Sequence, residues 1–220
     1  KLSFSYHTNG PKVLNDINFE IKKGEKIGLV GETGSGKSTL IDILMGLLTC
    51  DEGHISVDNQ IISKNNKSAW QKNIAHVPQS IFLADTTIKN NIAFGINEEH
   101  IDNKKIIESC KLAHIYDDIM KFENQFDSIV GERGVKLSGG QRQRIGIARA
   151  LYKEAEFIVF DEATSALDTN TEVKVINELN NIDHLTSIMI AHRLTSLKHC
   201  NKILHLKDNK IYKITTYDEL

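Results

Sequence analysis

The chain has 220 residues, 40% of them apolar and 25% charged, which is typical of one globular domain or of one domain with a smaller inserted lobe. A formal net charge of −2 argues against the broad basic surface of a nucleic-acid-binding protein, so we expect no nucleic-acid partner. Its three cysteines are far apart and form no C-x-x-C pair, which argues against a disulfide framework or a zinc site and favours a reducing compartment.

The first third of the sequence predicts short strands around a glycine-rich loop. Residues 2–6, 17–21 and 26–30 are expected to be strands, separated by turns at residues 7–12 and 22–25. A loop at residues 31–36 follows, and residues 37–48 carry apolar side chains at helical spacing. Residues 55–57 and 74–77 read as further strands. The expected early architecture is an antiparallel β region followed by a strand, a loop and a helix.

The middle of the chain has a different character, because little of it reads as strand. Residues 103–113 and 116–120 are predicted helices, and we interpret residues 81–145 as an inserted helical subdomain. Residues 1–80 and 146–220 would form the core lobe of a single domain spanning residues 1–220. The sequence shows no run of about 18 apolar residues, so no membrane-spanning helix is expected.

The last third alternates helices with strands. Residues 140–152 and 171–181 are predicted helices, and residues 157–160, 187–191, 202–206 and 210–214 are predicted strands. Alternation of this kind indicates an α/β fold with a mainly parallel sheet flanked by helices on both faces. Because the chain begins at Lys1 without a methionine, directly on a strand pattern, we expect it to be part of a longer polypeptide.

The loop at residues 31–38 satisfies the phosphate-loop pattern G-x-x-x-x-G-K-[ST] in full, which indicates a P-loop core. Its glycines let backbone N–H groups approach phosphates closely, and the following helix directs its positive end to the same place. Lys37 would contact the β- and γ-phosphates, and the Ser38 hydroxyl would bind Mg²⁺. The nucleotide-binding residues predicted here are Gly31, Thr33, Gly34, Ser35, Gly36, Lys37, Ser38 and Thr39.

Two acids follow the apolar strand at residues 157–160. Asp161 stands at the end of a parallel strand, where α/β sheets bind ligands, and is the predicted Mg²⁺ ligand. Glu162 would face the γ-phosphate and polarise the attacking water. Alone, Asp161 and Glu162 could be two solvated acids. A phosphate loop, however, needs a carboxylate to hold Mg²⁺, and hydrolysis needs a group to orient water, so the functional interpretation is favoured.

A second anion site is predicted at Ser138, Gly139, Gly140 and Gln141, which open the helix that follows. One nucleotide does not need two such sites from one chain. We therefore expect each chain to lend its second site to a partner chain, so that a nucleotide is held between two protomers.

The run from Leu137 to Gln141, L-S-G-G-Q, is similar to the signature of the ATP-binding-cassette family, and the motifs follow the family's order over the whole chain. The resemblance implies an ATPase with ATP and Mg²⁺ as cofactors. It assigns Tyr6 to adenine stacking, Gln79 to Mg²⁺ and to coupling with the membrane part, Asp168 to the dimer interface and His192 to the γ-phosphate. The expected catalytic set is Glu162, His192, Gln79 and Lys37, and the expected metal set is Ser38, Gln79 and Asp161.

Three stretches, at residues 86–95, 130–134 and 216–220, resemble the exporter branch of the family. That resemblance implies a transmembrane domain in the same polypeptide, a second nucleotide-binding domain that is identical or homologous, and a place at the cytoplasmic face of a membrane. Asn90 departs from the branch's usual glutamate. Residues 81–85 resemble exporters of lipid-linked saccharides. Two alternatives stay open at this stage: a soluble cassette ATPase acting on DNA or ribosomes, and a nucleotide-binding regulator without turnover.

Overall fold

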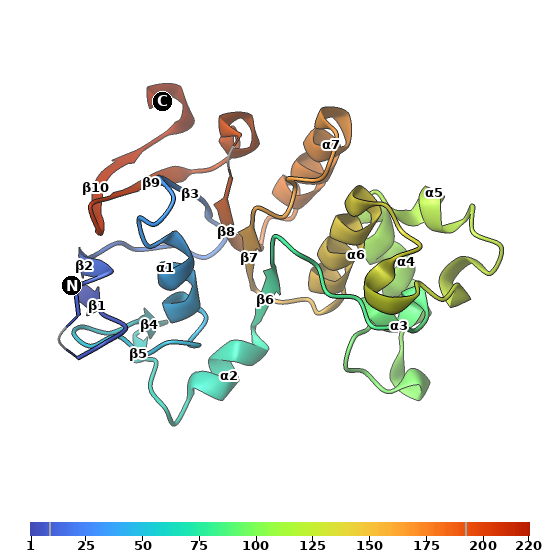
Figure 1. The fold of residues 1–220 in the computed structure, drawn as a ribbon, viewed down its shortest axis with the longest axis horizontal. Helices are drawn as coiled ribbons and strands as arrows, with labels where there is room; N and C mark the ends of the chain where they lie inside the picture. The colour runs from blue at the N-terminus through green and yellow to red at the C-terminus, as the bar shows by residue number, and fades with distance from the viewer. Residues whose placement is uncertain (9, 192) are drawn as a thin grey trace.

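A six-stranded sheet forms the centre of the computed structural model, which describes residues 1–8, 10–191 and 193–220 (Figure 1). The strands lie in the order β10-β9-β3-β8-β7-β6, and all neighbouring pairs are parallel except β10 with β9. The sheet therefore confirms the predicted α/β class. Its strands are β3 (Lys26–Gly31), β6 (Ile74–Val77), β7 (Phe157–Asp161), β8 (Thr186–Ile190), β9 (Lys202–Lys207) and β10 (Lys210–Thr215).

Two small antiparallel sheets precede or flank this centre. β1 (Leu2–Phe4) pairs with β2 (Leu14–Ile17), and β4 (Ser56–Val57) pairs with β5 (Gln60–Ile61). The strand predicted at residues 17–21 is wrong, because pairing with β1 ends at Ile17. The alternation of apolar and polar residues beyond that point continues in irregular backbone, where Phe19 and Ile21 still pack on the core.

One face of the sheet is covered by α1 (Lys37–Leu44). Val159 on β7, together with Ile188 and Ile190 on β8, shares an apolar cluster with Leu40 of this helix. The predicted helix at residues 37–48 stops four residues early, because its end at Met45 is followed by Gly46 in a left-handed turn with φ of 68°. A short helix that was not predicted, α2 (Lys67–Lys72), precedes β6.

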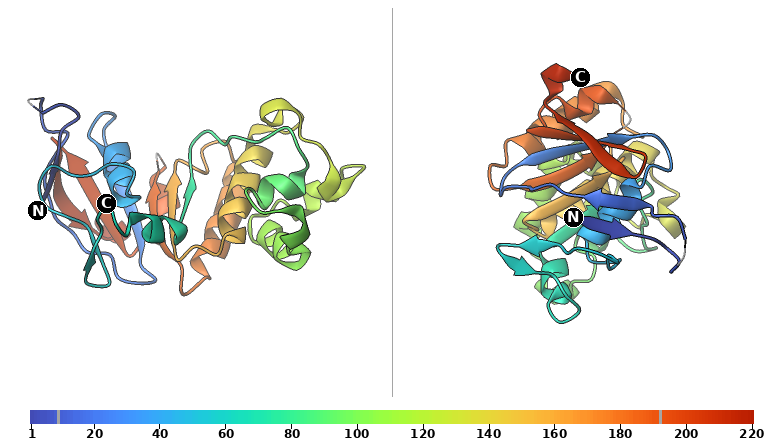
Figure 2. Two further views of the ribbon diagram at one scale, coloured as in Figure 1. Left: turned by 90° about the horizontal axis from the view of Figure 1, so that it is seen from below. Right: turned by 90° about the vertical axis from the view of Figure 1, so that its left-hand side faces the viewer.

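The opposite face of the sheet carries α6 (Gly139–Tyr152) and α7 (Thr169–Asn180). Ile158 and Phe160, which alternate with Val159 along β7, share a second apolar cluster with residues of both helices. Figures 1 and 2 show the same separation, with α1 and α6 on opposite sides of β7 and β6. The starts of α1 and α6 therefore belong to different faces of one sheet.

The segment between β6 and α6 is helical, as predicted, and extends away from the sheet beyond α6 (Figure 2). α6 packs against both α3 and α4 of this segment and against β6. α6 runs through the boundary predicted at residues 145–146, and the division into core and helical subdomain stays a prediction. The elements of the segment are α3 (Ile88–Ile92), η1 (Glu98–His100), α4 (Asn103–Leu112), α5 (Tyr116–Ile119), η2 (Gln125–Asp127) and η3 (Glu132–Gly134).

Two single turns of 3₁₀ helix complete the chain, η4 (Leu194–Leu197) after β8 and η5 (Tyr217–Glu219) after β10. Among the helices of the described residues, none combines the length and the apolar character needed to cross a bilayer.

Candidate functional site

The phosphate loop connects the end of β3 to the start of α1. Gly36 precedes the helix with φ of 102°, and Gly34 has φ of 82°, a backbone region that side-chain-bearing residues rarely adopt. A Cβ atom at Gly31 would overlap the carbonyl oxygen of Leu206 and would lie 2.8 Å from Ser35 Oγ. The loop therefore needs glycine at each of these places, for backbone conformation at two and for space at the third.

Lys37 and Ser35 supply a positive charge and an unpaired hydroxyl at this loop. The Lys37 ammonium donates hydrogen bonds of 2.8 Å to the carbonyl oxygens of Gly31 and Glu32. Ser35 Oγ is buried and has no hydrogen-bond partner among the described residues, while Thr33 and Ser38 are exposed. A buried hydroxyl without a protein partner beside a lysine and a helix N-terminus fits a site for phosphate oxygens.

Tyr6 lies next to the same loop. Its hydroxyl shares a hydrogen bond of 3.0 Å with Thr39 Oγ1, and the Phe4 ring meets its ring edge to face, with centroids 5.0 Å apart. The residue remains 56% exposed. The structure thus brings this aromatic side chain to the phosphate loop and leaves part of its surface accessible to a base.

Asp161 and Glu162 stand at the end of β7, as predicted. Glu162 has a left-handed backbone with φ of 52°, and its N–H donates to the carbonyl oxygen of Ile190 on β8. Gln79 follows the neighbouring strand β6, and its side-chain amide donates to the Glu162 carboxylate over 2.6 Å. The left-handed conformation costs on the order of 1–3 kcal/mol and is found mainly at functional sites.

The Asp161 carboxyl has a raised pKa. Burial is the main cause, and the charges of Glu162 and Asp42 act in the same direction, whereas His76 and Lys37 lower the pKa. The carboxylate is therefore close enough to Lys37 to interact electrostatically, and it lies among other acids that a cation would stabilise. One carboxylate, one hydroxyl and one amide, from Asp161, Ser38 and Gln79, suit Mg²⁺, which prefers oxygen ligands and shares them with phosphates.

The described residues contain no group of three or more His, Cys, Asp or Glu side chains able to hold a metal ion by themselves.

The predicted second anion site lies at the start of α6. Ser138 caps the helix by accepting a hydrogen bond from the N–H of Gln141 over 3.2 Å, and the Gln141 side chain accepts from the N–H of Ser138 over 2.9 Å. Ser138 is exposed, and both glycines are partly exposed. The N-terminus of a 14-residue helix thus faces solvent with N–H groups and a hydroxyl.

Asp168 caps the start of α7, where its carboxylate accepts a hydrogen bond from the N–H of Thr171. Hydrogen bonds from Thr171 lower the pKa of this exposed carboxyl. The structure therefore gives Asp168 a local capping role. The predicted γ-phosphate contact His192 lies outside the described residues.

Sequence reasoning missed two buried polar residues behind this region, Gln143 on α6 and Glu172 on α7, each 4% exposed. Glu172 shares the buried side of its helix with Val175, Ile176 and Leu179. An acid at helical spacing within an apolar stripe was the signal that could have found it.

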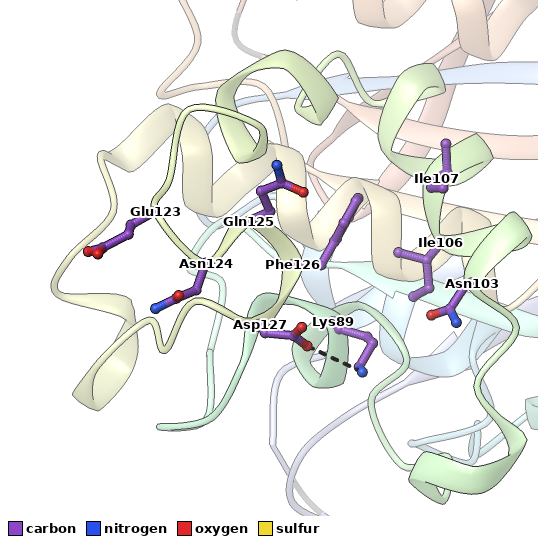
Figure 3. A pocket seen from close by; sticks show the side chains of 9 residues that line it. All are labelled: Lys89, Asn103, Ile106, Ile107, Glu123, Asn124, Gln125, Phe126 and Asp127. Atoms are coloured by element: carbon purple, nitrogen blue, oxygen red, sulfur yellow. Dashed lines mark ion pairs between the residues drawn. The ribbon is translucent and has the colours of Figure 1, made fainter.

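A cavity of about 590 Å³ lies in the helical segment and not at the phosphate loop (Figure 3). Phe126 and Ile106 contribute apolar lining, and Lys89 pairs with Asp127 over 3.3 Å at its edge. None of the predicted nucleotide-binding residues lines this cavity.

Comparison with known proteins decides the family. Residues 14–165 match the sequence profile of the ABC transporter family. The chain belongs to that family. This ATP-binding domain is 41% identical over 220 residues to the heavy metal tolerance protein of Schizosaccharomyces pombe, and it covers 26% of that protein's length. It is 39% identical over 220 residues to the ATP-dependent lipid A-core flippase of Salmonella paratyphi A and covers 38% of it.

Among solved structures, the ABC domain is similar to a bacterial Atm1-family ABC exporter with ATP bound. The TM-score is 0.92 and the sequences are 34% identical, with 99% of this chain and 38% of the exporter chain covered. The match confirms both the ABC nucleotide-binding fold and the ATPase class. The chain spans well under half the length of each of these relatives.

Proposed function

We propose that this ABC ATPase domain powers export across a membrane by closing as a dimer around two ATP–Mg²⁺ and reopening after hydrolysis. The observation that carries the proposal is the placement of the two anion sites. The phosphate loop and α1 belong to one face of the sheet, and the exposed start of α6 belongs to the other. Two protomers facing each other would satisfy both sites with one triphosphate.

The role of each residue follows from its place in the site. Lys37 and the N–H groups of the loop would bind the β- and γ-phosphates, and Tyr6 would stack on adenine. Glu162, oriented by Gln79, would accept a proton from the attacking water. Bound Mg²⁺ would offset the phosphate charge, held by Ser38, Asp161 and Gln79. The remaining proposed contacts are His192 in the same protomer, and Ser138, Gly139, Gly140 and Gln141 of the partner subunit.

ATP would drive closure because it binds the closed dimer better than the open one. ATP has contacts with both anion sites only in the closed dimer, so its binding shifts the equilibrium toward closure. Hydrolysis separates the γ-phosphate from the nucleotide and removes that differential affinity, and the dimer opens.

A surface on the helical segment is suited to the membrane part. Phe82 and Phe94 are 60% and 54% exposed. The Arg149 guanidinium lies 4.9 Å from the Phe94 ring centroid and donates to the Phe82 carbonyl oxygen over 3.0 Å, so Phe82, Phe94 and Arg149 lie in one patch. Phe82 is three residues after Gln79. We infer that this patch docks a transmembrane domain at the cytoplasmic face and transmits the closure of the nucleotide site.

The proposed direction of transport, export, rests on the similarity of this domain to a flippase and to an exporter. The names of the relatives point to different cargoes, a lipid A core in one and heavy-metal tolerance in another. The proposal therefore covers export and does not select a cargo, and the lipid-linked saccharide suggested by residues 81–85 stays a prediction.

The test is the variant Glu162→Gln in the purified chain. We expect the parental chain to release phosphate from ATP, and the variant to bind ATP and form an ATP-dependent dimer while turnover falls by about 100-fold or more. Light scattering with and without ATP measures the dimer. Hydrolysis at the parental rate by Glu162→Gln would show that the assigned role is wrong. Absence of turnover in the parental chain, with ATP bound, would favour a nucleotide-binding regulator.

A further inference from the structure

Glu172 on α7 is a buried carboxylate that the proposed mechanism does not use. One carboxylate oxygen accepts hydrogen bonds from Thr164 Oγ1 over 2.7 Å and from Ser196 Oγ over 2.6 Å. The other forms an ion pair with Arg193 over 2.7 Å. Three donors from two separate segments thus converge on one side chain.

The two segments adjoin the proposed catalytic residues. Thr164 lies two residues after Glu162, in a turn where the N–H of Ser165 donates to the carbonyl oxygen of Glu162. Arg193 follows His192 directly in the sequence, and Ser196 lies in η4. Glu172 is therefore the side chain that joins the segment after one catalytic residue to the segment after the other.

Formation of α7 does not need this carboxylate. Asp168 already caps the helix, and Glu172 faces the same side as three buried apolar residues. An apolar side chain would cover that side without the cost of removing a charge from water. What the carboxylate adds is a fixed geometry for its three donors.

Gln143 holds the same turn from α6. Its side-chain amide donates to Ser165 Oγ over 3.0 Å, and its carbonyl oxygen accepts from the N–H of Ala166 over 2.8 Å. Gln143 lies two residues after Gln141, in the first turns of the helix that opens with the second anion site. The polar contacts therefore run from that helix through residues 164–166 to residues 193–196.

We propose that Glu172 is a positioning residue for ATP hydrolysis, which fixes the segments after Glu162 and His192 in one arrangement, with Gln143 tying that arrangement to the helix of the second anion site. The inference rests on the proposed function, because it takes Glu162 as the residue that activates water. Glu172 itself does not contact the reacting atoms in this account.

The test compares Glu172→Gln with the parental chain, with turnover expressed per bound ATP so that a misfolded fraction does not count. We expect kcat to fall about tenfold, equivalent to about 1.4 kcal/mol, while the Kd for ATP changes less than twofold. Glu178→Gln is the matched control, because Glu178 lies on the same helix and pairs only loosely with His114, over 3.6 Å. It should keep the parental kcat.

A merely structural role would lower the folded fraction and leave turnover per bound ATP unchanged, and that result would overturn the inference. If Glu172→Gln does not fold, Ser196→Ala decides, since it removes only one donor: a fall in kcat of about threefold supports the proposal and parental turnover contradicts it. An inactive Glu162→Gln together with a fully active Glu172→Gln would reject only this inference. Activity in both would reject the proposed function as well.

Discussion

Gly146, in the middle of α6, allows this helix to pack against the segment that follows Gln79. It is buried, and a Cβ atom there would lie 2.5 Å from Ile81 Cδ1 and 2.9 Å from Ile81 Cγ1. Real Cβ atoms do not approach other heavy atoms that closely, so Gly146→Ala must displace Ile81 or the helix.

Two opposing effects set the change in the free energy of unfolding caused by Gly146→Ala. Alanine within a helix is favoured over glycine by about 1 kcal/mol, and overpacking a well-packed core costs about 1–3 kcal/mol. Because Cγ1 as well as the terminal methyl of Ile81 is in the way, we expect the cost to exceed the gain, with a net loss of about 1 kcal/mol. For a chain of this length that loss lowers Tm by about 2–4 °C.

Urea unfolding of a double-mutant cycle provides the assay. Ile81→Ala removes the three atoms that a Cβ atom would contact, so Gly146→Ala combined with Ile81→Ala should be less destabilised than the sum of the single variants, by at least about 0.5 kcal/mol. A Gly146→Ala variant as stable as the parental chain, together with an additive cycle, would refute the packing argument.

Three further outcomes are expected. Gly31→Ala should destabilise the chain more than Gly34→Ala, because a Cβ atom meets the Leu206 carbonyl in the first and open space in the second; comparison of Tm values tests this. Burial raises the pKa of Glu172, but hydrogen bonds and an ion pair outweigh it and lower the pKa overall. The parental chain should therefore be more stable than Glu172→Gln above about pH 4.5, and this difference should vanish as pH falls through the lowered pKa. Unfolding of both chains at several pH values measures it. Cys110 is fully buried and burial raises its pKa to about 12, so it should resist alkylation until the chain unfolds, as mass spectrometry would show.

The elements that sequence reasoning found are those with a strong local signal. The phosphate loop, its strand and the first turns of α1 follow from glycine spacing and helical period, and the parallel sheet follows from alternating elements. The end of α1 was misplaced because Leu47 and Leu48 continue the apolar pattern beyond Gly46, whose left-handed backbone ends the helix. α2 and α3 are five or six residues long, too short to show a helical period.

For the site, contiguous motifs predicted that Lys37 follows the glycine-rich loop and that Asp161 and Glu162 stand at a strand end, and the structure has them there. Their roles stay predictions. The Gln79–Glu162 hydrogen bond joins residues 83 positions apart, and the contacts of Glu172 with Arg193 and Ser196 join residues 21 and 24 positions apart. Such pairs form only once the strands are ordered in the sheet, and no local pattern in a single sequence encodes them.

Complementation between two defective chains tests most directly whether one ATP is shared by two protomers. Lys37→Ala damages the phosphate loop, and Gly139→Asp adds a carboxylate at the second anion site, where a Cβ atom makes only an ordinary contact of 3.5 Å with Ala166. Each variant alone should be inactive. In an equal mixture half of the dimers are mixed and each carries one intact site, so phosphate release should return to about a quarter of the parental rate. A mixture as inactive as its components, or an active variant alone, would contradict the shared site.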